Sequence, residues 1–66
     1  MYQKLIAELA GPGYDPRHIE AYMRIQYGTL DHLSRDDFKR EVAICKECID
    51  VASLEQAEQC AKSFGL

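Results

Sequence analysis

The sequence predicts an all-α protein, a small four-helix bundle formed by a single helical domain that spans residues 1–66. Two observations favour this fold. Apolar residues recur at steps of three and four along most of the chain, and no stretch alternates apolar and polar residues for long enough to form a strand. Capping residues, glycines and prolines divide the helical pattern into four helices, expected at about 2–10, 16–27, 35–52 and 54–64.

The first helix is expected to pack through one apolar stripe. Its members are Tyr2, Leu5, Ile6 and Leu9. The run Gly11-Pro12-Gly13 ends this helix, because glycine tolerates the backbone angles of a helix stop and proline cannot continue the hydrogen-bond pattern.

The second helix has boundary signals at both ends. Asp15 can act as its N-cap, and Pro16 fits the first helical position, where its missing N–H costs nothing. Gly28 is a typical stop. The inward stripe is expected to comprise Ile19, Tyr22, Met23 and Gln26. In the connector that follows, Leu30 and Leu33 are expected to face the core.

The third helix begins with a capping box. Ser34 is the expected N-cap and Asp37 its partner three residues later. Asp36 also stands in the first turn, where the helix dipole favours negative charge. The inward stripe is expected to comprise Phe38, Val42, Cys45, Ile49 and Ala52.

A corner is predicted at Ser53, where neither glycine nor proline marks a break. Three apolar residues follow it: Leu54, Ala57 and Ala61. In an unbroken helix they would lie about 100° to 160° away from the Phe38 stripe, on the wrong side for one core. Ser53 and Gln56 have the spacing of a capping box, so a fourth helix is expected to fold back and end near Gly65. The alternative is one long bent helix.

The distribution of charge narrows the class of partner. The formal charge of −3 comes from interleaved acidic and basic residues, whereas nucleic-acid binders usually carry a basic stripe. No apolar run reaches the roughly 18 to 20 residues of a membrane span, and the N-terminus shows no signal-peptide pattern. We therefore expect a cytoplasmic protein without membrane association, for which a nucleic-acid partner is disfavoured.

Three cysteines raise the question of a metal or redox site. Cys45 and Cys48 form a Cys-x-x-Cys pair, and Cys60 follows. A structural zinc site needs four ligands, and a thioredoxin-like pair begins a helix after a strand, whereas this pair lies in mid-helix. We therefore predict no metal and no cofactor, with Cys45 and Cys60 in the core and Cys48 partly exposed. A cysteine-based metal or redox site remains an alternative.

Both histidines are interpreted as solvated residues. Neither His18 nor His32 stands beside a nucleophile in the sequence, and a four-helix domain of this size is expected to leave little volume for a ligand pocket. We therefore predict no catalytic residue, no enzymatic activity and no small-molecule substrate.

DNA binding is the alternative function, because the second and third helices are consecutive. Its basic residues would be Arg35, Lys39 and Arg40. The connector is longer than the usual three or four residues of a helix-turn-helix, and Asp36 and Asp37 would face the phosphates.

An excess of apolar residues on two helices predicts a contact surface. Ile44, Cys48 and Val51 lie about 80° to 140° from the Phe38 stripe, and Ile25 is similarly displaced from its own stripe. A central helix with neighbours on two sides would also explain this pattern. The predicted interaction surface comprises Tyr22, Ile25, Ile44, Cys48 and Val51, facing a protein partner or a second copy in a homodimer.

Part of the chain resembles the three-helix ubiquitin-associated domain. Gly13-Tyr14 stands between the first two predicted helices, where that family has a glycine–aromatic loop. The long connector before Ser34 and the length of the third helix depart from the family's pattern, so no family is assigned. From its residues, the chain is predicted to be a non-enzymatic protein–protein interaction or self-association module.

Overall fold

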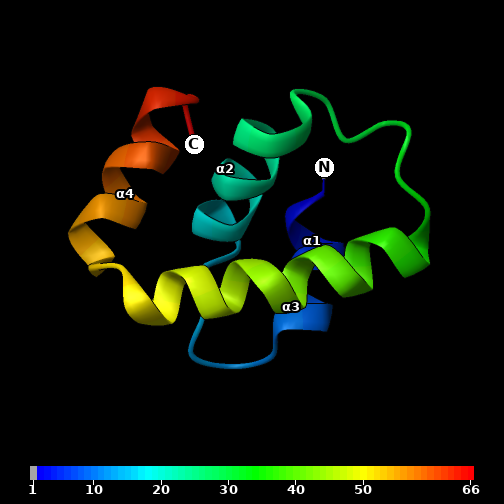
Figure 1. Ribbon diagram of the computed structural model, residues 1–66, viewed down its shortest axis with the longest axis horizontal. Coiled ribbons are helices and arrows are strands. Elements are labelled where there is room, and N and C mark those ends of the chain that lie inside the picture. Colours follow the sequence, from blue (N-terminus) through cyan, green and yellow to red (C-terminus); the bar gives the residue numbers. More distant parts are fainter. Residues whose placement is uncertain (1) are drawn as a thin grey trace.

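The computed structural model describes residues 2–66 and contains four α-helices (Figure 1). They are α1 (Gln3–Ala10), α2 (Pro16–Tyr27), α3 (Arg35–Val51) and α4 (Leu54–Ser63). No strand occurs in residues 2–66. The predicted all-α, four-helix fold is confirmed, and each predicted helix boundary agrees with the observed one to within one residue.

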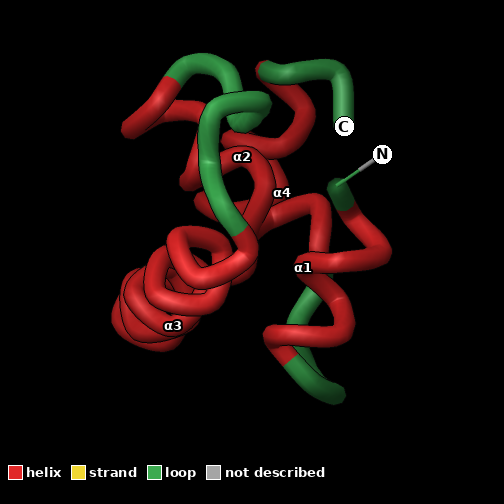
Figure 2. The backbone as a smooth tube through the Cα atoms, turned by 90° about the vertical axis from the view of Figure 1, so that its right-hand side faces the viewer, coloured by secondary structure: helices red, strands yellow, loops and turns green. Residues whose placement is uncertain are grey.

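Helix α2 is the centre of the molecule, because it packs against each of the other three helices. Helix α3 crosses the front of the view in Figure 1, and α1 lies behind it, as the turned view in Figure 2 shows. Helices α1 and α3 also pack against each other, whereas α4 packs mainly on α2. Three helices therefore share one core, and the fourth is added at the side of α2.

Short-range hydrogen bonds fix the helix ends where the sequence predicts them. The Asp15 carboxylate accepts from the backbone N–H of Arg17 at 2.9 Å, ahead of Pro16 in the first position of α2. Ser34 and Asp37 form the complete capping box, each side chain accepting from the other residue's N–H at 3.1 Å. Each cap satisfies N–H groups that have no partner inside the helix.

The chain turns sharply between α3 and α4. Ala52 and Ser53 both have extended backbone angles, and the Ser53 hydroxyl accepts from the N–H of Gln56 at 3.1 Å. The predicted corner is confirmed, and the alternative of one long bent helix is wrong. Figure 1 shows α4 rising from the end of α3 to stand beside α2.

The core is shared by α1, α2, α3 and the connector before α3. Its buried members are Ile6, Ala10, Ile19, Met23, Leu30, Phe38, Val42, Cys45 and Ile49. Leu33, Tyr22 and Ala52 are only half-buried. The expectation that Gln26 faces inward is wrong, because the sector of α2 that carries Gln26 and Ile25 is covered by no neighbouring helix and both residues are exposed.

Helix α4 packs through its small residues. Ala57 and Ala61 have no exposed surface, and neither has Ala21 on α2. Leu54 was expected on the same inward face but is 70% exposed, because it is the first residue of α4 and lies at the corner, ahead of the turns that pack on α2. Small side chains such as these allow the backbones of α2 and α4 to approach closely.

Enlarging a buried alanine of α4 is expected to destabilise the fold. Ala61→Leu adds three carbon atoms where no space is exposed, so we expect the free energy of unfolding to fall by about 1 to 3 kcal/mol in urea denaturation. Gln59→Leu is the matched control, since Gln59 is exposed on the same helix, and a change within about 0.5 kcal/mol is expected. Equal losses in both variants would contradict the packing described for α4.

Candidate functional site

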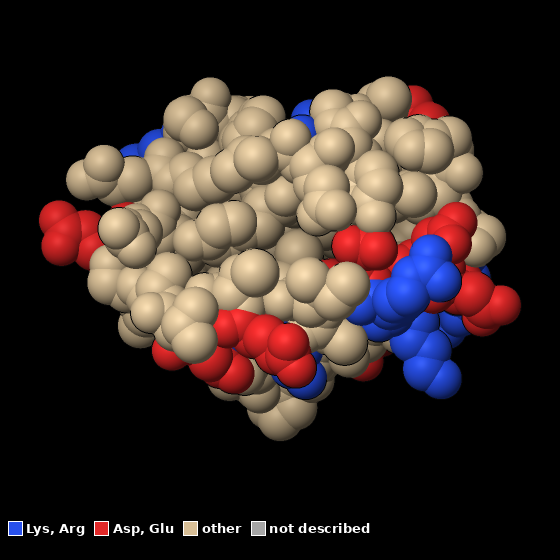
Figure 3. Space-filling view, in the orientation of Figure 1, with Lys and Arg blue, Asp and Glu red and all other residues tan. Residues whose placement is uncertain are grey.

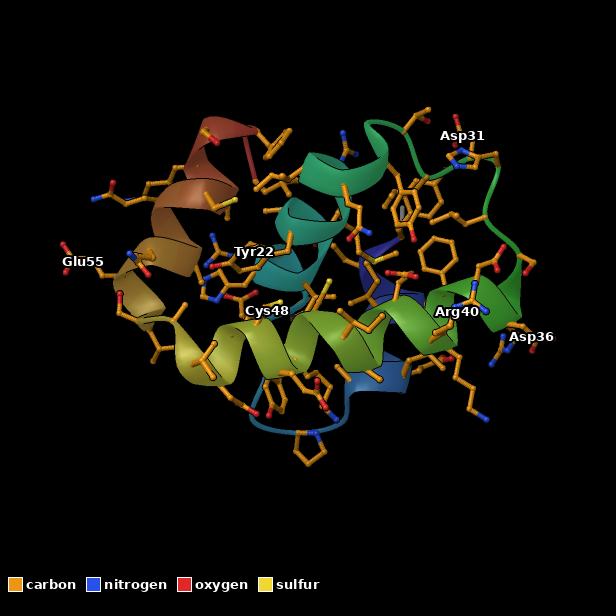
Figure 4. All side chains as sticks on the ribbon, in the orientation of Figure 1. Tyr22, Asp31, Asp36, Arg40, Cys48 and Glu55 are labelled. Carbon is orange, nitrogen blue, oxygen red and sulfur yellow. The ribbon has the colours of Figure 1, made fainter. Side chains whose placement is uncertain are left out.

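The five predicted contact residues lie in two adjoining stripes, one on α2 and one on α3; we call this set the contact face. Ile25 is 62% exposed, Ile44 44% and Val51 90%, Cys48 is also exposed, and Tyr22 is half-buried. Tyr22 and Cys48 lie near each other between the two helices (Figure 4), so the stripes meet there.

The surface around the contact face carries few charges. In Figure 3, which has the orientation of Figure 4, most of the visible Lys, Arg, Asp and Glu side chains lie in the lower part and at the right-hand end of the molecule, and smaller groups lie at its left and upper margins. Between and above them, a broad uncharged area extends over α2 and α4. Two further apolar side chains are exposed, Leu54 at the start of α4 and Phe64 directly after its end. These apolar side chains therefore remain exposed after the four helices have packed together.

The three cysteines are free thiols in three different environments. Cys45 is buried, Cys60 half-buried and Cys48 exposed. Burial raises the pKa of Cys45 to about 12. The expectation that Cys60 lies in the core is wrong, because α4 packs at the side of α2 and Cys60 is half-buried outside the main core. Burial, followed by the nearby Cys60, Cys48 and Cys45, raises the pKa of Tyr22. The three thiols therefore lie near one tyrosine, but they differ in their access to solvent.

Sequence reasoning missed a cluster of charged side chains that joins α2 to α4. His18 was expected to be solvated, yet it is only 7% exposed, and its Nε2 lies 2.9 Å from Glu58 Oε1 and 3.8 Å from Asp15 Oδ2. Asp15 and His18 are three residues apart in the first turn of α2, but Glu58 comes from α4. The burial of His18 follows from the corner that folds α4 back onto α2.

Arg17 completes this α2–α4 ion-pair cluster. Its Nη2 lies 2.7 Å from Asp15 Oδ2 and 2.8 Å from Glu58 Oε1, and its Nη1 donates to the Leu66 carbonyl at 3.2 Å. The hydrogen bond from Arg17 holds the pKa of Asp15 below its usual range. Hydrogen bonds from His18 and then Arg17 do the same for Glu58.

The same cluster has the residue types of a metal site. Among residues 2–66, Asp15, His18 and Glu58 are the group of three potential ligands whose donor atoms lie within 4.8 Å of one another. The guanidinium of Arg17 already binds both carboxylates, however, and its positive charge would repel a cation. The arrangement therefore fits an ion-paired contact between helices and does not fit a metal centre.

A cleft opens beside the ion-pair cluster, contrary to the expectation that the domain leaves little volume for a pocket. It has a volume of about 530 Å³ and lies where the α1–α2 loop, the start of α2 and the α3–α4 corner meet. It is lined by Gly13, Tyr14, Asp15, His18, Ile49, Asp50, Ala52 and Leu54. The Tyr14 hydroxyl donates to Asp50 Oδ1 at 2.9 Å, which ties the loop to α3.

The basic residues considered for DNA binding lie among acidic ones. Arg40 Nη2 is 2.9 Å from Asp37 Oδ1, and Arg40 and Asp36 project from the same end of α3 in Figure 4. Arg35 and Lys39 are exposed in the same region. The second histidine, His32, is exposed as expected, with its ring edge-on to Tyr27. Positively and negatively charged side chains are therefore interleaved at this end of α3.

Comparison with protein-family models, with curated proteins and with solved structures finds no match to this chain. Within residues 2–66, each helix is too short or too polar to cross a bilayer.

Acid is expected to weaken the fold through the ion-pair cluster. Glu58 and Asp15 have folded pKa values below their ordinary values of 4.5 and 3.8, so the unfolded chain binds protons first as the pH falls. Their stabilising contribution is complete above these values and is lost as the pH falls through them and through the lower folded values. Urea midpoints measured from neutral pH down to about pH 3 should therefore decrease in this window.

Removing the Glu58 charge tests this assignment. Glu58→Gln should be less stable than the parent at neutral pH and should show a flatter loss of stability in acid, because one of the linked groups no longer titrates. Glu8→Gln is the control, since Glu8 is exposed on α1. The assignment would be contradicted by acid profiles of equal slope in the Glu58 variant and the parent.

The thiols are expected to react in the order of their exposure. At low protein concentration, a disulfide reagent should modify Cys48 first and Cys60 more slowly, because the thiolate attacks and needs access to solvent. Cys45 should react only after denaturation, because it is buried and its pKa is raised to about 12. Mass spectrometry of labelled peptides identifies the order, and early labelling of Cys45 would contradict the described core.

Proposed function

We propose that this protein is a non-enzymatic helical module that self-associates through the contact face. The observation that carries the proposal is the exposure of Ile25, Ile44, Val51 and Cys48 on α2 and α3, two helices that pack against each other. Single exposed apolar side chains are common on protein surfaces. Apolar side chains collected on one face instead mark sites of contact with another protein.

The dimensions of the contact face suit a dimer of so small a chain. The protein exposes 4226 Å², and a stable interface buries roughly 800 Å² on each partner, about a fifth of that surface. Helix α3 has 17 residues and is therefore about 25 Å long. Two copies of α3, each flanked by α2, supply a contact of the required length.

The scarcity of charge supports a second copy as the partner. In a two-fold symmetric dimer the same patch meets itself, so any charge at its centre faces a like charge. The five residues of the contact face carry no charge, and Figure 3 shows an uncharged area extending over α2 and α4. Tyr22 also suits an interface, because its ring packs while its hydroxyl keeps a polar partner.

The basic residues at the other end of α3 do not favour DNA binding as a second function. Arg40 is paired with Asp37, and Asp36 stands between Arg35 and that pair, so this region would present both signs to a phosphate backbone.

Sedimentation equilibrium tests the proposal with matched variants. The parent is expected to form a dimer at concentrations of tens of micromolar, and Ile44→Lys should weaken the dimer at least about tenfold, because each copy would bury a lysine. Ala43→Lys is the control: Ala43 is exposed and adjacent, but it points about 100° away around α3. Circular dichroism should show the same helix content in all three proteins.

Labelling of Cys48 gives an independent measure of the same contact. Its reaction with a thiol reagent should slow as the protein concentration rises, because the second copy covers it, while labelling of the denatured chain stays unchanged. A parent that remains monomeric, or an Ile44→Lys variant that dimerises like Ala43→Lys, would refute self-association.

A further inference from the structure

One side of α3 changes in character along the helix. Five residues share this side at alternating steps of four and three, the spacing of a coiled-coil seam. They are Asp37, Glu41, Ile44, Cys48 and Val51, and all lie within about 60° of Cys48 around the helix axis. The half toward the start of α3 therefore carries two acids, and the half toward the corner carries three uncharged side chains of the contact face.

The two acids are only partly neutralised by a basic side chain. Arg40 Nη2 lies 2.9 Å from Asp37 Oδ1, but its Nε is 3.7 Å from Glu41 Oε1, and Arg40 itself is exposed. Glu41 Oε2 is buried and has no hydrogen-bond partner among residues 2–66. A second copy placed over this half of α3 would remove water from charges that have weak partners, which is unfavourable.

Two-fold symmetry allows the α3 helices of a dimer to run parallel or antiparallel. In a parallel pair every residue of this side faces its own copy, so Asp37 meets Asp37 and Glu41 meets Glu41, and like charges at an interface repel. In an antiparallel pair only the residues at the crossing point face their own copies. A crossing point in the uncharged half therefore carries the acids of the two copies to opposite ends of the interface.

Cys48 is the middle residue of the uncharged half. Ile44 stands about 6 Å before it along the helix axis and Val51 about 4.5 Å after it. Antiparallel helices that cross at Cys48 bring Ile44 of one copy to within about 1.5 Å of the level of Val51 in the other. The small side chain of Cys48 permits a close crossing. Figure 2 shows α3 at one edge of the molecule, where a second copy can approach it.

We infer that in the self-associated protein the α3 helices of the two copies lie antiparallel and cross at Cys48, with Ile44 of each copy packed against Val51 of the other. The inference rests on the proposed self-association and adds the orientation of the second copy and the position of the two-fold axis.

Disulfide formation between copies of the full chain tests the crossing point. Diamide accepts the two hydrogen atoms that are released when two thiols join, and the disulfide forms only where the two Cα atoms come within about 7 Å. A chain with Cys60→Ser keeps Cys48 as its one thiol outside the core, since Cys45 is buried. At tens of micromolar, diamide is expected to convert this chain to a disulfide-linked dimer.

Two further variants test the orientation. Each carries Cys48→Ala and Cys60→Ser, together with either Ile44→Cys or Val51→Cys. In the antiparallel pair each new thiol lies about 9 to 12 Å along the axis from its own copy but level with the other. A mixture in which one variant is labelled with nitrogen-15 should therefore form the mixed disulfide at least about tenfold faster than either variant links to itself, as measured by mass spectrometry.

A distance measurement outside the interface gives the orientation independently. Spin labels are attached at Arg35→Cys, an exposed position at the start of α3, in a chain that also carries Cys48→Ala and Cys60→Ser. Arg35 is thirteen residues from Cys48, so in the antiparallel dimer the two labels should lie about 39 Å apart along the axis in pulsed electron paramagnetic resonance. In a parallel dimer they would be separated only by the distance between the helices and the reach of the labels.

Sedimentation equilibrium of the same chains separates the two possible failures. Dimers whose Ile44→Cys and Val51→Cys thiols link to themselves as fast as to each other, whose labels lie close together, or whose Cys48 forms no disulfide overturn the antiparallel arrangement and leave self-association standing. A parent chain that is monomeric at these concentrations overturns both.

Discussion

The extended backbone at Ala52 and Ser53 is the constraint on which the rest of the structure depends. Without this corner, α3 and α4 would form one rod, and the apolar residues of α4 would lie on the wrong side of it. With it, Ala57 and Ala61 are buried against α2, and Glu58 reaches the first turn of that helix. The corner also supplies one wall of the cleft. A single serine cap therefore sets the positions of a packing contact, a charged cluster and a cavity.

Helix α4 is held to α2 by two contacts of different physical character. Ala57 and Ala61 are completely buried, so their contact with α2 excludes water. Contacts between small apolar side chains do not by themselves select one orientation of α4. The ion pairs of Arg17 with Asp15 and Glu58 are about one-third exposed, and ion pairs in such surroundings contribute little stability. Their effect is directional, because only one rotation of α4 brings Glu58 to both Arg17 and His18. The buried alanines and the partly exposed ion pairs therefore hold α4 on α2 in different ways.

The features that the sequence predicts correctly are those fixed by neighbouring residues. Helix ends at Asp15, Ser34 and Ser53 depend on side chains that cap N–H groups two or three positions away, so the boundaries are readable from the chain alone. The burial of His18 cannot be predicted from neighbouring residues, because it depends on Glu58, forty residues later in the chain. The spacing of apolar residues shows which face of a helix is apolar, but it does not show which helix covers that face. For this reason the prediction that Leu54 faces the core is wrong. The cleft was missed for the same reason, since its walls come from three separate segments.

The attachment of α4 mainly to α2 affects how the fold is expected to open. The main hydrophobic core joins α1, α2, α3 and Leu30, and it contains no residue of α4. Opening of α4 about the corner is therefore expected to leave that core intact and to cost less free energy than global unfolding. Amide protons of α4 should exchange with solvent through this partial opening, whereas those in the middle of α2 and α3 should exchange only when the whole molecule unfolds. The structure thus combines a three-helix core with a fourth helix that packs mainly on α2.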